Sequence, residues 1–174
     1  MSEYSLGFSE SLIVAAQYML EDGIESEDAQ RTVLYLSLLS CEITLKSLLE
    51  KAGMPIAEIK AHSHKLDKLL ADLSTRCEVE EYGESSSRWR RATTIRSKTM
   101  YRNGEQLTLG KLMEAEKEGT SKYPVQIRYG HSIRNYPPDA WLEAAKILHE
   151  YARAYWGKIR IRVTLPSPPS TDLD

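Results

Sequence analysis

The sequence has almost no net charge. Its formal net charge is −2, from 23 lysine and arginine residues against 25 aspartate and glutamate residues. This balance excludes the overall basic field that marks many nucleic-acid-binding proteins. Any attraction for phosphate must therefore come from a local patch of basic side chains.

Cysteine is also scarce, and metal-binding patterns are absent. Cys41 and Cys77 form no closely spaced pair, and disulfide frameworks belong to much smaller chains than this one of 174 residues. Cys41 lies in an apolar run, which predicts a buried thiol. His62 and His64 stand at i and i+2, so they point in different directions from a helix, and zinc needs further ligands. We expect them to bond backbone groups at a helix start, and we expect no metal ion and no cofactor.

Motifs of several enzyme classes and of membrane proteins are missing too. The sequence contains no P-loop, no dinucleotide-type glycine pattern and no nucleophile elbow. The first residues, "MSEYSLGFSE", lack the basic segment and long apolar region of a secretory signal. The longest apolar run, residues 33–49, is interrupted by Glu42 and Lys46 and is a poor membrane span. We expect a cytoplasmic protein without membrane contact.

Apolar residues at helical spacing are what the sequence does have. They predict helices over about residues 8–21, 26–52, 64–73, 85–101, 107–118 and 137–155. The second of these is apolar nearly all round, which is typical of the central helix of a bundle. The segment "EVEEYGESSS" is interpreted as a loop, "YPVQIRYG" as extended and "KIRIRV" as a strand.

This pattern predicts an all-α protein, an antiparallel helical bundle of about five helices. Residues 1–163 would form a single domain, and the Pro/Ser-rich residues 164–174 a disordered tail.

The order of three segments resembles the HEPN superfamily. "CEITLKSLLEKAG" is followed by "AHSHKLDKLLADL" and later by "QIRYG" before a final amphipathic helix, and the resemblance covers residues 9–155. Members of this family are all-helical domains of toxin–antitoxin pairs, phage-defence proteins and nucleotide-binding modules. The resemblance implies a four- to five-helix bundle that commonly dimerises and, in active members, metal-independent endoribonuclease activity.

The catalytic motif of active HEPN members is absent. That motif is an arginine followed by a histidine with four to six residues between them, and no arginine has this spacing to any of the four histidines. The resemblance therefore predicts a homodimeric, non-catalytic module. We expect it to bind RNA, a nucleotide or a protein partner such as an antitoxin, in a toxin–antitoxin or defence system. The alternatives are a diverged endoribonuclease and a purely structural interaction module.

Arg128, His131 and Arg134 are the candidate residues for the endoribonuclease alternative. They lie close together in "KYPVQIRYGHSIRNYPPDAW". Arginine offers planar donors that fit phosphate, and histidine can donate or accept a proton near neutral pH. The three residues could equally bind an anion without cleavage, or hold an ordered loop by bonding helix carbonyls.

A second candidate surface is the basic run from Arg88 to Arg102, which contains six basic residues and no acidic residue. On a helix, Arg88, Arg91, Lys98 and Arg102 would form one stripe, either a solvated face or a surface for phosphate or an acidic partner. Arg96 would face the core. A buried guanidinium needs a partner, for which Glu42 is the candidate.

Glu42, Lys46 and His64 are expected to form a polar seam. Glu42 and Lys46 stand at i and i+4, in the favourable order for an ion pair. Because their helix is otherwise apolar, they indicate a polar seam or cleft within the bundle.

Overall fold

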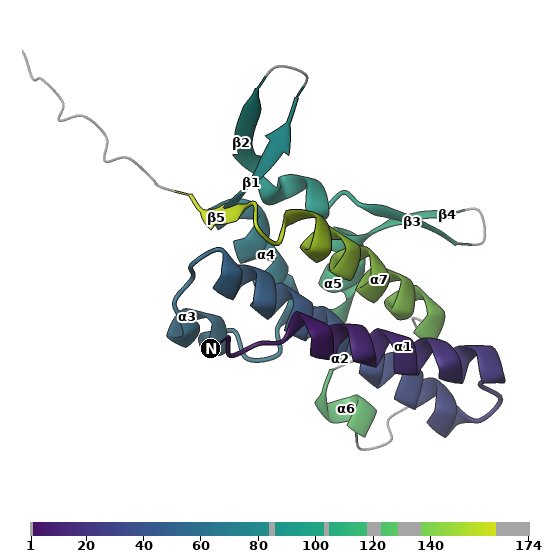
Figure 1. Cartoon of the computed structure of the whole chain (residues 1–174). Helices are drawn as coiled ribbons and strands as arrows, with labels where there is room; N and C mark the ends of the chain where they lie inside the picture. The colour runs from purple at the N-terminus through teal and green to yellow at the C-terminus, as the bar shows by residue number, and fades with distance from the viewer. Residues whose placement is uncertain (1, 84–85, 103–104, 118–122, 129–136, 163–174) are drawn as a thin grey trace, which may run out of the picture.

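The computed structural model describes residues 2–83, 86–102, 105–117, 123–128 and 137–162 (Figure 1). The helices within these ranges are α1 (Leu6–Asp22), α2 (Glu27–Lys51), α3 (Ile56–Ala61), α4 (Leu66–Arg76), α5 (Leu109–Lys117), α6 (Val125–Arg128) and α7 (Pro138–Tyr155). The strands are β1 (Cys77–Tyr82), β2 (Ser87–Arg91), β3 (Thr99–Arg102), β4 (Glu105–Thr108) and β5 (Ile159–Ile161), with a 3₁₀ turn, η1 (Ala92–Ile95), after β2.

Helix α2 is the centre of the fold and packs against α1, α4 and α7 (Figure 1). Ser26 caps its start by accepting a hydrogen bond from the Ala29 amide at 3.1 Å, and Glu27 and Asp28 occupy the first turn. By length and composition alone α2 could cross a membrane, but 72% of its most apolar window is buried in the fold. A buried core helix passes the same test, so this finding is weak evidence for a membrane span.

The prediction of an all-α bundle is wrong, because the described residues also form two antiparallel sheets. One has the order β2-β1-β5, and the other pairs β3 with β4. In β1, buried Cys77 and Val79 alternate with more exposed residues, which is the period of two that strands require. The loop interpretation of this segment missed the alternation because its other residues are acidic or aromatic. The fold is therefore mixed α and β.

The helix predicted over residues 85–101 is also wrong, since this segment forms β2, η1 and part of β3. Two features oppose a helix. Thr93, Thr94, Ile95 and Thr99 are β-branched, which lowers the propensity for an α-helix, and the first three lie in the 3₁₀ turn η1. The acidic β1 strand also offers opposite charges directly across the hairpin, where Glu78 faces Arg91 and Glu81 faces Arg88.

The remaining predicted elements mostly match the structure. The helices predicted over 8–21, 26–52, 64–73, 107–118 and 137–155 correspond to α1, α2, α4, α5 and α7, and the predicted C-terminal strand corresponds to β5. Helix α3 was not predicted. The extended interpretation of 123–130 is wrong for α6, which follows a cis peptide bond between Tyr123 and Pro124. The tail, residues 164–174, lies outside the described residues.

Both cysteines are free and buried, as expected for Cys41. Burial raises the pKa of the Cys41 thiol well above its ordinary range and that of Cys77 to about 12. Neither thiol is therefore a ready nucleophile, because the thiolate is the reactive form.

Candidate functional site

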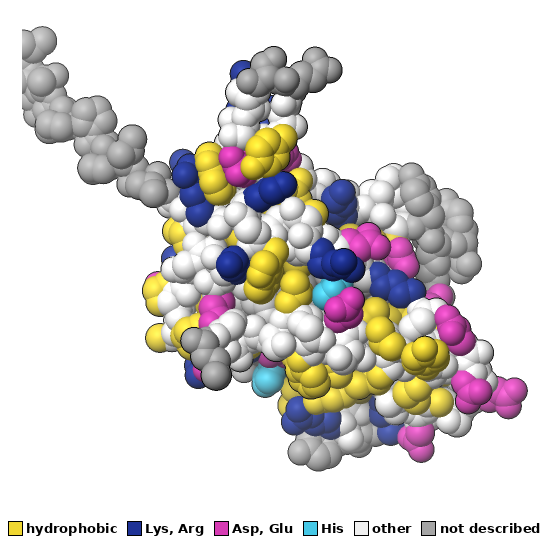
Figure 2. Space-filling view, viewed as in Figure 1, with side chains coloured by type: hydrophobic (Ala, Val, Ile, Leu, Met, Phe, Trp, Pro, Cys, Tyr) yellow, Lys and Arg dark blue, Asp and Glu magenta, His cyan; other side chains and the backbone are white. Residues whose placement is uncertain are grey.

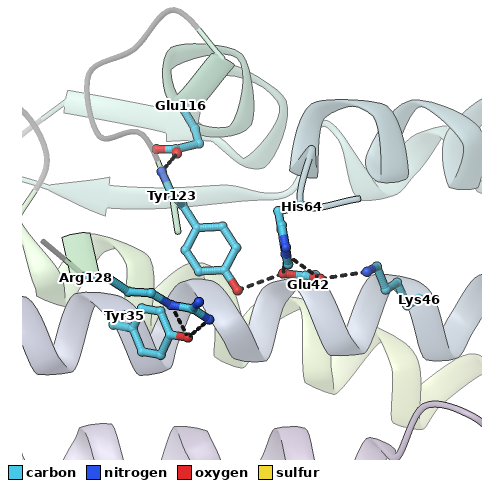
Figure 3. A network of polar contacts seen from close by, with 7 residues as sticks. All are labelled: Tyr35, Glu42, Lys46, His64, Glu116, Tyr123 and Arg128. Carbon is cyan, nitrogen blue, oxygen red and sulfur yellow. Dashed lines mark hydrogen bonds and ion pairs between the residues drawn. The ribbon is translucent and has the colours of Figure 1, made fainter. Parts of the chain in front are cut away.

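Glu42 is the centre of a buried polar network (Figure 3). Its side chain is 6% exposed. Its carboxylate accepts hydrogen bonds from Lys46 Nζ at 2.7 Å, from His64 Nδ1 at 3.0 Å and from the Tyr123 hydroxyl at 2.7 Å. These donors come from α2 itself, from the loop before α4 and from the residue two positions before α6. The network therefore ties three separate segments to the central helix.

The electrostatics keep the Glu42 carboxyl group ionised. Burial alone would raise its pKa, but the hydrogen bonds from Lys46, His64 and Tyr123 outweigh burial and lower the pKa below its ordinary value. Burial, reinforced by the charge of Glu42, raises the pKa of the Tyr123 hydroxyl, which stays protonated and donates. The positive charge of Lys46 thus balances the buried negative charge of Glu42, and the carboxylate oxygens accept their hydrogen bonds from side chains of the same protein.

The structure brings Glu42, Lys46 and His64 together, as the polar seam requires. Sequence reasoning missed Tyr123, which lies 81 residues from Glu42. Its backbone amide donates to Glu116 Oε1 at 2.6 Å, so the tyrosine is held at both ends. No local pattern signals this contact, because it depends on how a connecting segment lies across α2.

A pocket of about 440 Å³ opens beside His64 and Tyr123. The His64 side chain is 47% exposed, and its Nδ1 is engaged by Glu42. No hydrogen bond of Nε2 is seen within the described part of the chain. A carboxylate that accepts a hydrogen bond from Nδ1 in this way fixes the orientation of the imidazole ring.

Arg128 is engaged by a tyrosine of the central helix (Figure 3). Its Nε and Nη2 donate to the Tyr35 hydroxyl at 3.1 and 2.6 Å, and its guanidinium carbon lies 5.4 Å from the centre of the Tyr35 ring. This contact holds α6 against α2. His131 and Arg134 lie outside the described residues, so the three-residue anion or ribonuclease site stays a prediction.

The basic residues from Arg88 to Arg102 do not form one helical stripe, because they are spread over β2, the turn after η1 and β3. Arg88 and Arg91 lie on β2, Lys98 precedes β3, and Arg102 ends β3. The proposed pairing of Arg96 with Glu42 is wrong. Arg96 follows η1 and binds Glu114 of α5 at 2.5 Å, with its side chain 36% exposed. It is half-buried at the rim of the core, so it does not need a buried carboxylate.

One face of the β2-β1-β5 sheet combines exposed aromatic and basic side chains. Tyr82 of β1 is 67% exposed and Trp89 of β2 is 37% exposed. Lys158 Nζ lies 4.5 Å from the centre of the Tyr82 ring, and the guanidinium carbon of Arg160 lies 3.9 Å from that of Trp89. Arg91 shares this face, since β1 residues 78, 80 and 82 alternate with the buried 77 and 79. We call these five residues the aromatic-basic face.

The sheet around the aromatic-basic face carries a local excess of positive charge. Seven described basic residues lie on or directly beside its strands (Arg76, Arg88, Arg90, Arg91, Lys158, Arg160 and Arg162), against three acidic residues (Glu78, Glu80 and Glu81). Figure 2 shows hydrophobic, basic and acidic side chains together at the base of the β1–β2 hairpin. Sequence reasoning found Arg88 and Arg91 but not the face, since Lys158 and Arg160 come from the far end of the chain.

Within the described ranges, no group of three or more histidine, cysteine, aspartate or glutamate side chains is placed to hold a metal ion. Comparison of the chain with protein-family models, with curated proteins and with solved structures finds no match. The likeness to HEPN domains therefore rests on the sequence segments alone.

Proposed function

We propose that the protein is a non-catalytic, HEPN-like module that binds single-stranded RNA through the aromatic-basic face. The observation that carries this proposal is the pair of exposed aromatic rings, Tyr82 and Trp89, each with a cation beside it on one sheet face.

This arrangement suits single-stranded RNA because the unstacked bases have open faces. Bases stack on exposed aromatic rings and on arginine guanidinium planes, and lysine and arginine neutralise the phosphates between them. Trp89 and Arg160 together offer one stacking position, and Tyr82 with Lys158 offers another. Arg91 adds a further positive charge on the same face.

The Glu42 network supports the non-catalytic part of the proposal. Its carboxylate is buried, ionised and bonded by three side chains of the same protein. A group so fully engaged serves to fix the positions of Tyr123 and His64. We propose that it organises the fold and that the sheet contacts the RNA.

The test is a titration of the full chain into a short, unstructured, labelled RNA oligonucleotide, followed by fluorescence anisotropy. Binding should weaken steeply as salt rises, because phosphate contacts release counterions. Arg91→Glu should abolish most of the binding, whereas Lys111→Glu, at an exposed lysine of α5, should change it little. Binding that ignores salt, or equal binding by both variants, would overturn the proposal. Affinity for an acidic protein but not for RNA would instead favour the interaction module.

We also propose that the module is a homodimer. Phe8, Val14 and Tyr18 of α1 are 52%, 47% and 69% exposed, and Val14 and Tyr18 stand one helical turn apart, so their exposed apolar surface favours association with a second copy. Sedimentation should show a dimer that Tyr18→Glu converts to a monomer; a monomeric wild-type protein would refute this. An antitoxin-like partner, a defence context and a cytoplasmic location remain part of the proposal.

A further inference from the structure

His149 of α7 is a buried polar side chain without a hydrogen-bond partner among the described residues. The side chain is 9% exposed, and neither ring nitrogen has a hydrogen-bond partner in the described part of the chain. The nearest charged group to Nε2 is Glu10 Oε1, at 3.9 Å, which is too far for a hydrogen bond. Buried polar atoms are nearly always hydrogen-bonded, so these two nitrogens require an explanation.

The ring of His149 lines a pocket of about 630 Å³ between the start of α1 and the end of α7. This volume is within the range of small-molecule sites. The pocket shares no lining residue with the Glu42 network or the aromatic-basic face, although its Tyr4 ring lies 5.4 Å from Lys46 Nζ of that network.

The start of α1 presents free backbone donors to this pocket. Ser5 uses its hydroxyl for the Phe8 amide and its carbonyl for the Ser9 amide, both at 3.1 Å. The amides of Leu6 and Gly7, which also line the pocket, have no acceptor among the described residues. A Cβ on Gly7 would meet only the Ser5 hydroxyl, at 3.8 Å, so the backbone is open to approach. Such a helix start attracts anions.

Four further side chains line the pocket. Arg153 stands one helical turn after His149, and its side chain is 70% exposed, with Nη1 4.0 Å from Glu10. Tyr4 and Trp156 supply aromatic walls. The pocket thus combines donors for an anion at one end with flat apolar surface for a ring, and Glu10 offers an acceptor for hydroxyl groups between them.

We propose that this pocket binds a nucleoside monophosphate. The phosphate would accept hydrogen bonds from the Leu6 and Gly7 amides, from His149 and from Arg153, and the base would lie against Trp156. Ligand binding would then supply the partner that the His149 ring lacks. This inference is independent of RNA binding by the sheet, because the two sites share no residue.

Calorimetry on the full chain with adenosine monophosphate, adenosine and inorganic phosphate tests the proposal. The monophosphate should bind more tightly than either fragment. His149→Gln and Arg153→Ala should each weaken binding by at least about tenfold, because each removes a hydrogen bond to a charged group. Lys111→Ala, at an exposed lysine of α5, is the matched control and should bind as the wild type does. RNA binding should be unchanged in Arg153→Ala.

A second measurement keeps the proposal testable if His149→Gln does not fold. The backbone amide resonances of Leu6 and Gly7 in the wild-type protein should shift and saturate as adenosine monophosphate is added. The absence of saturable shifts at millimolar ligand, or equal affinity in wild type and Arg153→Ala, would overturn the proposal. Inorganic phosphate binding as tightly as the monophosphate would also overturn it, because the aromatic walls would then contribute nothing.

Discussion

The Glu42 network and the aromatic-basic face use the same kinds of side chain in opposite surroundings. Each combines a tyrosine with basic side chains. In the first, the Glu42 side chain is 6% exposed and is bonded by three donors of the same protein. In the second, Tyr82 is 67% exposed and its ring stays open to solvent beside Lys158. The buried cluster bonds within the protein and fixes its segments relative to one another. The exposed cluster can instead contact a ligand in solution.

The energetics of the two regions differ accordingly. A buried ion pair that loses one partner leaves an uncompensated charge, so its disruption is costly, whereas exposed pairs contribute little. Substitutions in the network should therefore change stability, and substitutions in the face should change binding. The following predictions are ordered from the largest expected effect to the smallest.

Glu42→Gln should destabilise the protein by about 3–5 kcal/mol, because it leaves Lys46 as a buried cation without a counterion. Urea denaturation followed by circular dichroism measures this. Glu114→Gln is the matched control, since Glu114 forms an exposed ion pair with Arg96, and it should cost less than about 1 kcal/mol. Similar losses in the two variants would show that the network has no special structural role.

Tyr123→Phe should destabilise by about 1.5–3 kcal/mol, because it removes a hydrogen bond to an ionised carboxylate. The same denaturation experiment applies. Tyr35→Phe serves as the comparison, since its hydroxyl accepts from the exposed Arg128 and its loss should cost less. A larger effect for Tyr35→Phe would show that the bond between Arg128 of α6 and Tyr35 holds residues 123–128 against α2 more strongly than the bond between Tyr123 and Glu42 does.

Trp89→Ala should weaken RNA binding by about 1–3 kcal/mol, the contribution of one stacked base, without changing the unfolding midpoint. Val125→Ala truncates an exposed apolar side chain of α6, outside the aromatic-basic face, and should leave RNA affinity unchanged. If both variants bind as the wild type does, the aromatic-basic face does not contact RNA.

The pH dependence of stability should have two parts. Burial lowers the pKa of His149, so this residue favours the folded state at high pH, and its contribution is lost as the pH falls below about 6.5. The pKa of Glu42 is also lowered, and its contribution is lost as the pH falls through about 4.5 and below. Denaturation curves at a series of pH values should therefore show stability falling on acidification. In a plot of unfolding free energy against pH, His149→Gln should remove the loss of stability below about pH 6.5, and Glu42→Gln should remove the loss below about pH 4.5.

The sequence predicted the helical part of the fold well and the sheets poorly. The helices α1, α2 and α7 carry long apolar stripes and clear starts, such as Ser26 and the prolines before α7, so periodicity located them. Strand β1 was not predicted because its alternation of buried and exposed residues is short and its exposed positions are mostly acidic. The helix predicted from Arg88 to Arg102 was wrong because a run of basic residues does not distinguish the 3.6-residue period of a helix from the two-residue period of a strand.

The candidate sites show the same division between local and distant information. Glu42 and Lys46 were found because they stand one turn apart on an otherwise apolar helix. Tyr123, Lys158 and Arg160 were missed because each meets its partner only through the fold. Arg96 was assigned the wrong partner because a helical period was applied to a segment that is not a helix.

The most direct test of the central claim is the RNA affinity of the double variant Tyr82→Ala/Trp89→Ala beside that of the wild-type protein. We predict salt-dependent binding by the wild type and a loss of at least about tenfold in the double variant, with an unchanged unfolding midpoint. Equal affinity in the two proteins, or no RNA binding by the wild type, would contradict the account.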